Sequence, residues 1–198
     1  MLGFLSRGFA HKCKALMKHP HYCKLFCPLC YDEAQAVLEA GVNYYKLYIM
    51  EQSYLIDKED LHKKYKLFQK VLHPDVLRSN GITNPNYSKF LSEAYQTLSC
   101  DVQRGKYLLK LHNENVEDFA MDDIEFLEEQ ISKRETLQQQ GARAAKKILR
   151  EVQKDEEELK KCIDKGFKQE NWMAIREALS KLSFLQKLEE EAKDLEEL

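Results

Sequence analysis

The chain has 198 residues, of which 43% are hydrophobic and 32% charged, and its formal net charge is −2. This composition is typical of a helix-rich protein with polar helix faces. No stretch approaches the roughly 18 consecutive apolar residues of a membrane span, and no basic stripe is combined with aromatic residues that could stack on bases. We therefore expect neither a membrane nor a nucleic acid among the partners.

Residues 1–12 have the composition of a targeting segment. They combine Leu2, Phe4 and Phe9 with Arg7 and Lys12, and they contain no acidic residue. A secretory signal would have a longer apolar region, so the pattern favours a short organelle-targeting presequence. The alternative is a terminus with no targeting role and no fixed structure.

Residues 13–41 form a cysteine-rich element followed by a linker. Four cysteines gather there, Cys13, Cys23, Cys27 and Cys30. The last two have the CxxC spacing that lets two thiolates share one tetrahedral metal ion, which favours a structural zinc site. Reduced thiols without a metal are the alternative. A redox CxxC is disfavoured because no βαβ pattern surrounds the motif.

Residues 42–117 predict a helical hairpin. Asp57 is a good N-cap for a helix that should end near Leu72, because Pro74 disfavours helix at the residue before it. Asn84 and Pro85 would begin a second helix, whose apolar residues share one face. On the first helix, Lys63, Lys66 and Lys70 gather opposite the apolar stripe. The His73-Pro74-Asp75 tripeptide would then lie at the tip of the hairpin.

A basic helix, a His-Pro-Asp loop and a second long helix together resemble a J-domain. The upstream sequence Asn43-Tyr44-Tyr45-Lys46-Leu47 is similar to the opening of such domains. The resemblance implies docking on the ATPase domain of a DnaK-type chaperone through six residues: Lys63, Lys66, Lys70, His73, Pro74 and Asp75. Lysines on such a face would mainly raise the association rate. The alternative is that His73 only ends a helix and that the lysines form a solvated face.

Residues 118–198 predict a three-helix bundle. The expected core stripes are Ala145, Ile148, Val152, Leu159, Cys162 and Phe167 on the middle helix and Ile175, Ala178, Leu182, Leu185, Ala192 and Leu195 on the last. Gly141 and Gly166 lie near the two short connections, which imply antiparallel neighbours. Cys100 and Cys162 are expected to be buried as small hydrophobic residues.

The first helix of this bundle carries two apolar faces. Phe126 and Leu137 project together, whereas Ile124, Leu127 and Ile131 project elsewhere. A second apolar patch on a small helical domain indicates a binding surface. The alternative is that these residues complete the core or pack on the J-domain.

Three further segments resemble the HscB family of J-protein co-chaperones. They are Arg104 to His112, which is similar to the family's Arg-x-x-Tyr-Leu-Leu-x-Leu-His segment, Phe126 to Ile131, and Lys181 to Leu188; Trp172 also matches. The Phe26-Cys27-Pro28-Leu29-Cys30 sequence resembles the zinc knuckle of animal mitochondrial members. The implied fold is all-α: a J-domain hairpin and a C-terminal three-helix bundle, preceded by a Cys-rich metal knuckle.

The resemblance also implies a function. The chain would bind the iron–sulfur cluster scaffold protein and stimulate the ATPase of a DnaK-type chaperone, without being an enzyme or needing a nucleotide of its own. Carried over by position, the scaffold-binding residues are Leu127, Ile131 and Phe184, with Glu128, Gln130, Glu135 and Gln139 as a polar rim. The implied location is the mitochondrial matrix, with a cytosolic pool and a homodimer left open.

Two other functions compete with this one. A J-protein for general unfolded clients would need an apolar cleft, which a compact acidic bundle does not favour. A zinc-dependent nucleic-acid or redox protein would depend on residues 1–31. An enzyme has little support, because the sequence contains neither a phosphate-binding loop nor a nucleophile motif.

Overall fold

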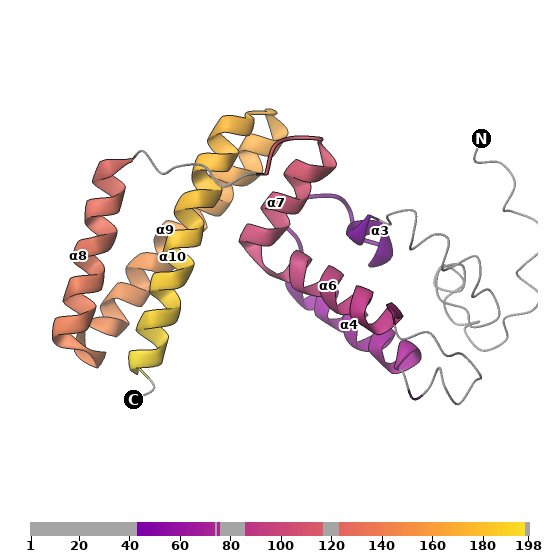
Figure 1. The fold of residues 1–198 in the computed structure, drawn as a ribbon, viewed down its shortest axis with the longest axis horizontal. Coiled ribbons are helices and arrows are strands. Elements are labelled where there is room, and N and C mark those ends of the chain that lie inside the picture. The colour runs from indigo at the N-terminus through magenta and orange to yellow at the C-terminus, as the bar shows by residue number, and fades with distance from the viewer. Residues whose placement is uncertain (1–42, 74, 76–85, 117–122, 197–198) are drawn as a thin grey trace, which may run out of the picture. The chain divides into compact units, whose positions relative to one another are not determined.

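The computed structural model describes residues 43–73, 75, 86–116 and 123–196. Within these residues every regular element is a helix (Figure 1), which confirms the predicted all-α fold. The predicted cysteine-rich knuckle lies outside the described residues. The described residues form two compact units, one from those within 43–52 and 57–98 and one from those within 53–56 and 99–196.

The first unit begins with a short helix whose cap matches the sequence pattern. Helix α3 (Tyr44–Leu47) starts at Asn43, whose side chain accepts a hydrogen bond from the Tyr45 amide. The tyrosine after the helix, Tyr48, is fully buried, and its hydroxyl donates to the carbonyl of Leu91 at 2.8 Å. A buried hydroxyl with a partner costs little to desolvate, so Tyr48 can join α3 to the hairpin.

The hairpin consists of α4 (Lys58–Leu72) and α6 (Asn86–Ser99). Asp57 caps α4 by accepting from the Glu59 and Asp60 amides, and α4 ends at Leu72, as predicted. Asn84 and Pro85, the predicted start of the second helix, lie outside the described residues. Contacts between the helices run from His62–Tyr95 to Gln69–Ser92, which makes them antiparallel. Their core contains Leu61, Phe68, Leu91, Ala94 and Leu98.

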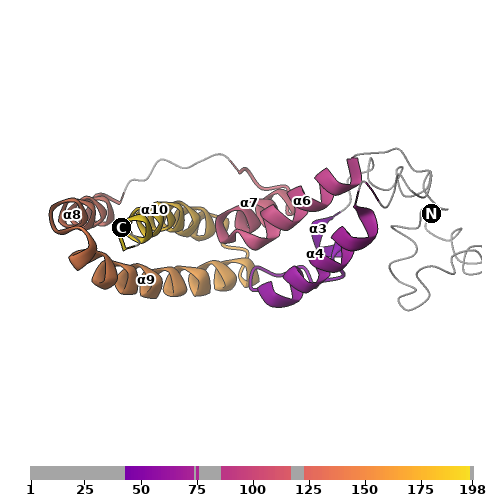
Figure 2. The same cartoon turned by 90° about the horizontal axis from the view of Figure 1, so that it is seen from below.

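The second unit is the predicted bundle with one additional helix. It contains α7 (Asp101–Leu111), α8 (Ile124–Gln140), α9 (Ala142–Lys168) and α10 (Trp172–Glu196). The long helices α9 and α10 lie side by side (Figure 2), and α7 packs on α10. At that crossing a Cβ on Gly105 would come within 2.4 Å of a Leu179 methyl carbon, so a glycine allows the close approach.

The predicted division placed residues 42–117 in the J-domain and its connector and residues 118–198 in the C-terminal domain. In the structure α7 packs within the second unit, together with residues 53–56. The turn between α8 and α9 is as short as expected. Gly141 forms it with φ 55° and ψ −137°, a conformation that only glycine adopts readily.

Of the twelve residues in the predicted core stripes, eight are buried, Leu159, Phe167 and Leu195 are half-buried, and Cys162 is exposed. Ala145, Ile148 and Val152 are at most 4% exposed, whereas Cys162 is exposed and Cys100 only half-buried. The expectation for Cys162 was therefore wrong. Ile163 is buried in its place, because it lies eleven residues after Val152 and returns to the same side of the helix, while Cys162 is turned about 100° away.

Candidate partner-binding surfaces

The first candidate surface is the basic face of α4. Lys63, Lys66 and Lys70 are all exposed, and the Lys63 side chain retains 76% of its accessible area. Its nearest acid is Glu59, 3.9 Å away on the same helix. Lys64 differs from these three, since its ammonium lies 2.7 Å from Asp60 and donates to the Ile49 carbonyl. The three predicted lysines therefore present their charge to solvent, where it can attract an acidic partner.

The second candidate surface follows α4 directly. His73 ends the helix, and its ring Nδ1 accepts a hydrogen bond from the Asp75 amide at 3.3 Å. The Asp75 carboxylate lies 3.6 Å from the same ring nitrogen and is 77% exposed. Pro74 lies outside the described residues. An exposed carboxylate beside an imidazole can accept a hydrogen bond from a cationic group of a partner.

The third candidate surface is the outer face of α8. Ile124 is 70% and Ile131 56% exposed, and Leu127 lies half-buried between them. Glu128, Glu135 and Gln139 are exposed nearby, as expected for a rim. The opposite face points inward: Leu137 is 1% exposed and Phe126 packs against the bundle core. The sequence prediction of two apolar faces is confirmed.

Phe184, the third predicted apolar contact, lies on α10 beside Phe126, which belongs to the inward side of α8. It is half-buried, and its ring meets the Phe126 ring edge to face at a centroid distance of 6.4 Å. The Lys187 ammonium lies 5.8 Å from the Phe184 centroid. Gln130, by contrast, does not belong to the rim. It is only 8% exposed, so its placement at the edge of the surface was wrong.

Ion pairs hold α8 against its neighbours. Asp123 caps α8 by accepting from the Phe126 amide, and Lys181 of α10 lies 2.7 Å from the same carboxylate. These two hydrogen bonds, first that from Lys181, hold the pKa of Asp123 below its usual value. Further along, Lys133 lies 3.1 Å from Asp155 of α9. Arg134 lies 2.7 Å from Glu191 of α10.

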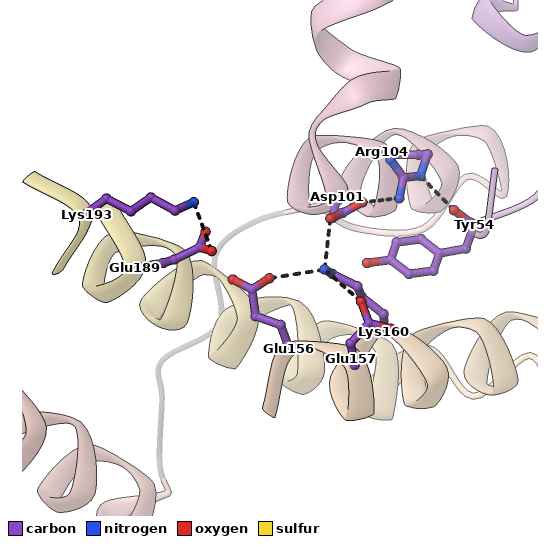
Figure 3. A network of polar contacts seen from close by, with 8 residues as sticks. All are labelled: Tyr54, Asp101, Arg104, Glu156, Glu157, Lys160, Glu189 and Lys193. Carbon is purple, nitrogen blue, oxygen red and sulfur yellow. Dashed lines mark hydrogen bonds and ion pairs between the residues drawn. The ribbon is translucent and has the colours of Figure 1, made fainter. Parts of the chain in front are cut away.

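A buried polar network lies in the second unit (Figure 3). Arg104 is 2% exposed, forms an ion pair with Asp101 and donates from Nε to the Tyr54 carbonyl at 2.7 Å. Its guanidinium also lies 5.0 Å from the Tyr54 ring centroid. The Arg104 network, by which we mean Tyr54, Asp101, Arg104, Glu156 and Lys160, therefore ties the short segment 53–56 to α7.

Lys160 of α9 completes the Arg104 network. Its ammonium lies 3.1 Å from Glu156 and 3.4 Å from Asp101. Burial lowers the pKa of Lys160, but the hydrogen bond to Glu156 and the charge of Asp101 outweigh it, so the net shift is upward. For the Glu156 carboxyl, burial is the largest effect and it raises the pKa. Sequence reasoning found Arg104 only as the first residue of a family segment, because a contact between residues fifty apart leaves no local pattern.

The predicted zinc ligands Cys13, Cys23, Cys27 and Cys30 lie outside the described residues. Among the residues that the structure does describe, no group of three or more His, Cys, Asp or Glu side chains is placed to hold a metal ion. In the same part of the chain, no helix combines the length and apolarity required to cross a membrane.

Comparison with known proteins gives consistent matches. Residues 122–193 match the family model described as the HSCB C-terminal oligomerisation domain. The human iron–sulfur cluster co-chaperone protein HscB is 28% identical over 178 residues, covering 86% of this chain and 74% of that protein. The region matched by the family model includes Leu127, Ile131 and Phe184, the predicted apolar contacts with the scaffold.

Solved structures show the same fold. The chaperone HscB from Vibrio cholerae superposes with a TM-score of 0.67 at 25% identity, covering 79% of this chain and 98% of that one. The crystal structure of human co-chaperone protein HscB superposes with a TM-score of 0.66 at 27% identity, covering 77% of this chain and 81% of that one. Both alignments extend well beyond the C-terminal bundle alone.

Proposed function

Because the chain belongs to the HscB family of co-chaperones in iron–sulfur cluster biogenesis, we propose that it delivers an iron–sulfur scaffold protein to a DnaK-type chaperone. One observation carries the proposal. A single chain presents an exposed His73–Asp75 loop beside a lysine face, and separately an exposed apolar face on α8. These are two binding chemistries suited to two different partners.

Each surface has a distinct physical task. Lys63, Lys66 and Lys70 attract an acidic patch of the chaperone and speed encounter. His73 and Asp75 then contact the chaperone's polar groups and trigger hydrolysis of the ATP that the chaperone holds. Leu127, Ile131 and Phe184 bury apolar area against the scaffold. Holding both partners on one chain raises the effective concentration of scaffold at the chaperone.

The test is single-turnover ATP hydrolysis by a DnaK-type chaperone, with this protein present, with and without the scaffold. Under the proposal, this protein alone accelerates hydrolysis, and the scaffold increases the acceleration further. Acceleration that is indifferent to the scaffold would leave the J-domain role intact and assign the α8 face to another client. Unfolded peptides that compete with the scaffold would favour a general client-binding J-protein.

The double substitution Leu127→Ala with Phe184→Ala is expected to weaken scaffold binding by at least about tenfold, since apolar anchors near the centre of an interface dominate its affinity. Isothermal titration calorimetry measures the loss. Stimulation of the chaperone by the J-domain in the absence of scaffold should stay unchanged.

A matched control for this pair is Met173→Ala, which removes an apolar side chain that is 78% exposed at the start of α10. It should leave the affinity unchanged. Because Phe184 contacts Phe126, the thermal unfolding midpoint of the double variant is recorded as well. Unchanged scaffold affinity in a folded double variant would remove this face from the proposal.

We further propose that Cys27 and Cys30, with Cys13 and Cys23, hold a structural zinc ion, on the basis of the CxxC spacing of Cys27 and Cys30. The presequence-like composition of residues 1–12 supports a mitochondrial matrix location. The description of the matched family as an oligomerisation domain supports self-association through residues 122–193.

A further inference from the structure

Helix α8 is attached to the bundle with very little apolar burial. Only two of its seventeen residues are buried, Gln130 and Leu137, whereas α10 buries seven. Helices in proteins gain most of their stability from tertiary packing, so α8 depends on its contacts with α9 and α10. The apolar residues that could have made those contacts, Ile124 and Ile131, face solvent instead.

The one buried polar residue of α8 weakens the attachment further. Gln130 is 8% exposed, and neither its amide nitrogen nor its amide oxygen has a hydrogen-bond partner among the described residues. A buried amide without partners opposes docking, because the same groups bond to water when the helix leaves. Gln130 therefore favours the undocked state of α8.

Besides the apolar contacts of Leu137 and Phe126 with the bundle core, the interactions that attach α8 are ion pairs between helices. Lys181 binds Asp123 at the start of α8 and also covers the Phe126 ring, 5.6 Å from its centroid. Lys133 binds Asp155 of α9, and Arg134 binds Glu191 of α10. The Lys181 and Lys133 side chains are only 19% and 12% exposed, so their charges are less screened than those of free surface lysines.

We propose that Lys181, Lys133 and Arg134 are positioning residues that supplement the small apolar contact of α8 and hold it on the bundle, so that α8 undocks and redocks as salt screens their ion pairs. Insofar as α8 presents Leu127 and Ile131 to a client, this rests on the proposed function. Only the docked state of α8 presents the intact apolar face. The apparent affinity for the client therefore falls when the docked fraction of α8 falls. An apolar interface thereby acquires a dependence on ionic strength.

The first experiment needs no partner, so its failure differs from a failure of the proposed function. Amide hydrogen exchange of the full chain is followed by mass spectrometry at low and at high sodium chloride. We expect α8 peptides to exchange faster than peptides of the α9–α10 core, and to accelerate with salt while the core peptides do not. Equal protection of α8 and the core, or an α8 rate indifferent to salt, would overturn the proposal.

Two substitutions should move the α8 exchange rate in opposite directions. Gln130→Leu removes the unpartnered amide at similar volume, and it should slow α8 exchange by about fivefold or more. Lys181→Met keeps the length of the side chain but removes its charge. It should speed α8 exchange by about two- to fivefold and reduce its salt dependence.

Each substitution has a control of the same chemistry on an exposed position. Gln138→Leu places leucine on the solvent side of α8 and tests whether helix propensity alone slows exchange. Lys146→Met removes an exposed α9 lysine that is not among the residues lining the hollow between α8 and α9. Neither control should alter α8 exchange. Equal effects of Gln130→Leu and Gln138→Leu would contradict the role assigned to Gln130.

Discussion

Substitution of Asp75 by asparagine is expected to abolish stimulation of the chaperone ATPase. The Asp75 carboxylate is 77% exposed and has the His73 ring nitrogen 3.6 Å away. Asparagine keeps the shape of the side chain and removes its charge, so a charge-assisted hydrogen bond to a partner is lost while the fold is undisturbed. We expect the single-turnover rate to fall by at least about tenfold, toward the basal rate of the chaperone, because hydrogen bonds to charged groups are worth roughly 1.5–3 kcal/mol.

The control for Asp75 is Glu93→Gln, which also removes one exposed carboxylate from the first unit. Glu93 lies on α6 and pairs with Lys89 at 3.8 Å, so it should leave stimulation unchanged. Both variants should bind the scaffold with the affinity of the unmodified protein, because the α8 face belongs to the second unit. Full stimulation by the Asp75 variant would refute the assigned role of the loop.

The hairpin could be predicted from sequence because its signals are local. Asp57 caps α4 through amides two and three residues away, and the turn at His73 follows from the proline beside it. The exposure of Lys63, Lys66 and Lys70 follows from the helical period alone. Interactions of this range are contained in a short window of sequence, so composition and spacing are sufficient to find them.

In the second unit, local sequence signals were not sufficient to predict the packing. Helical spacing separated the two apolar faces of α8 correctly. The rim position of Gln130 was instead carried over from the family resemblance, although the helical period puts Gln130 on the same side as Phe126 and Leu137. The buried position of Gln130 is set by α9 and α10, which pack on it from elsewhere in the chain. The packing of α7 on α10 depends in the same way on distant residues, Gly105 and Leu179.

The Arg104 network also could not be predicted from local sequence. Removing its arginine is the substitution with the largest expected change in stability. Arg104→Met is expected to lower the free energy of unfolding by about 3–5 kcal/mol, the usual cost of removing one partner of a buried ion pair. Asp101, at 5% exposure, would lose its guanidinium partner and be left near Lys160 at 3.4 Å. The Tyr54 carbonyl would lose its donor as well.

Urea denaturation followed by circular dichroism measures this loss. Arg143→Met is the matched control, because Arg143 is exposed on α9 and its removal should change stability by no more than about 0.5 kcal/mol. Adding Asp101→Leu to Arg104→Met should recover part of the stability, since a buried pair replaced as a whole by apolar residues leaves no uncompensated charge. Recovery should be partial, because Asp101 also lies in the first turn of α7, where a carboxylate is favourable. A single variant as stable as the unmodified protein would mean that the Arg104 network contributes no net stability, and that its charges serve only to select one packing of residues 53–56 on α7.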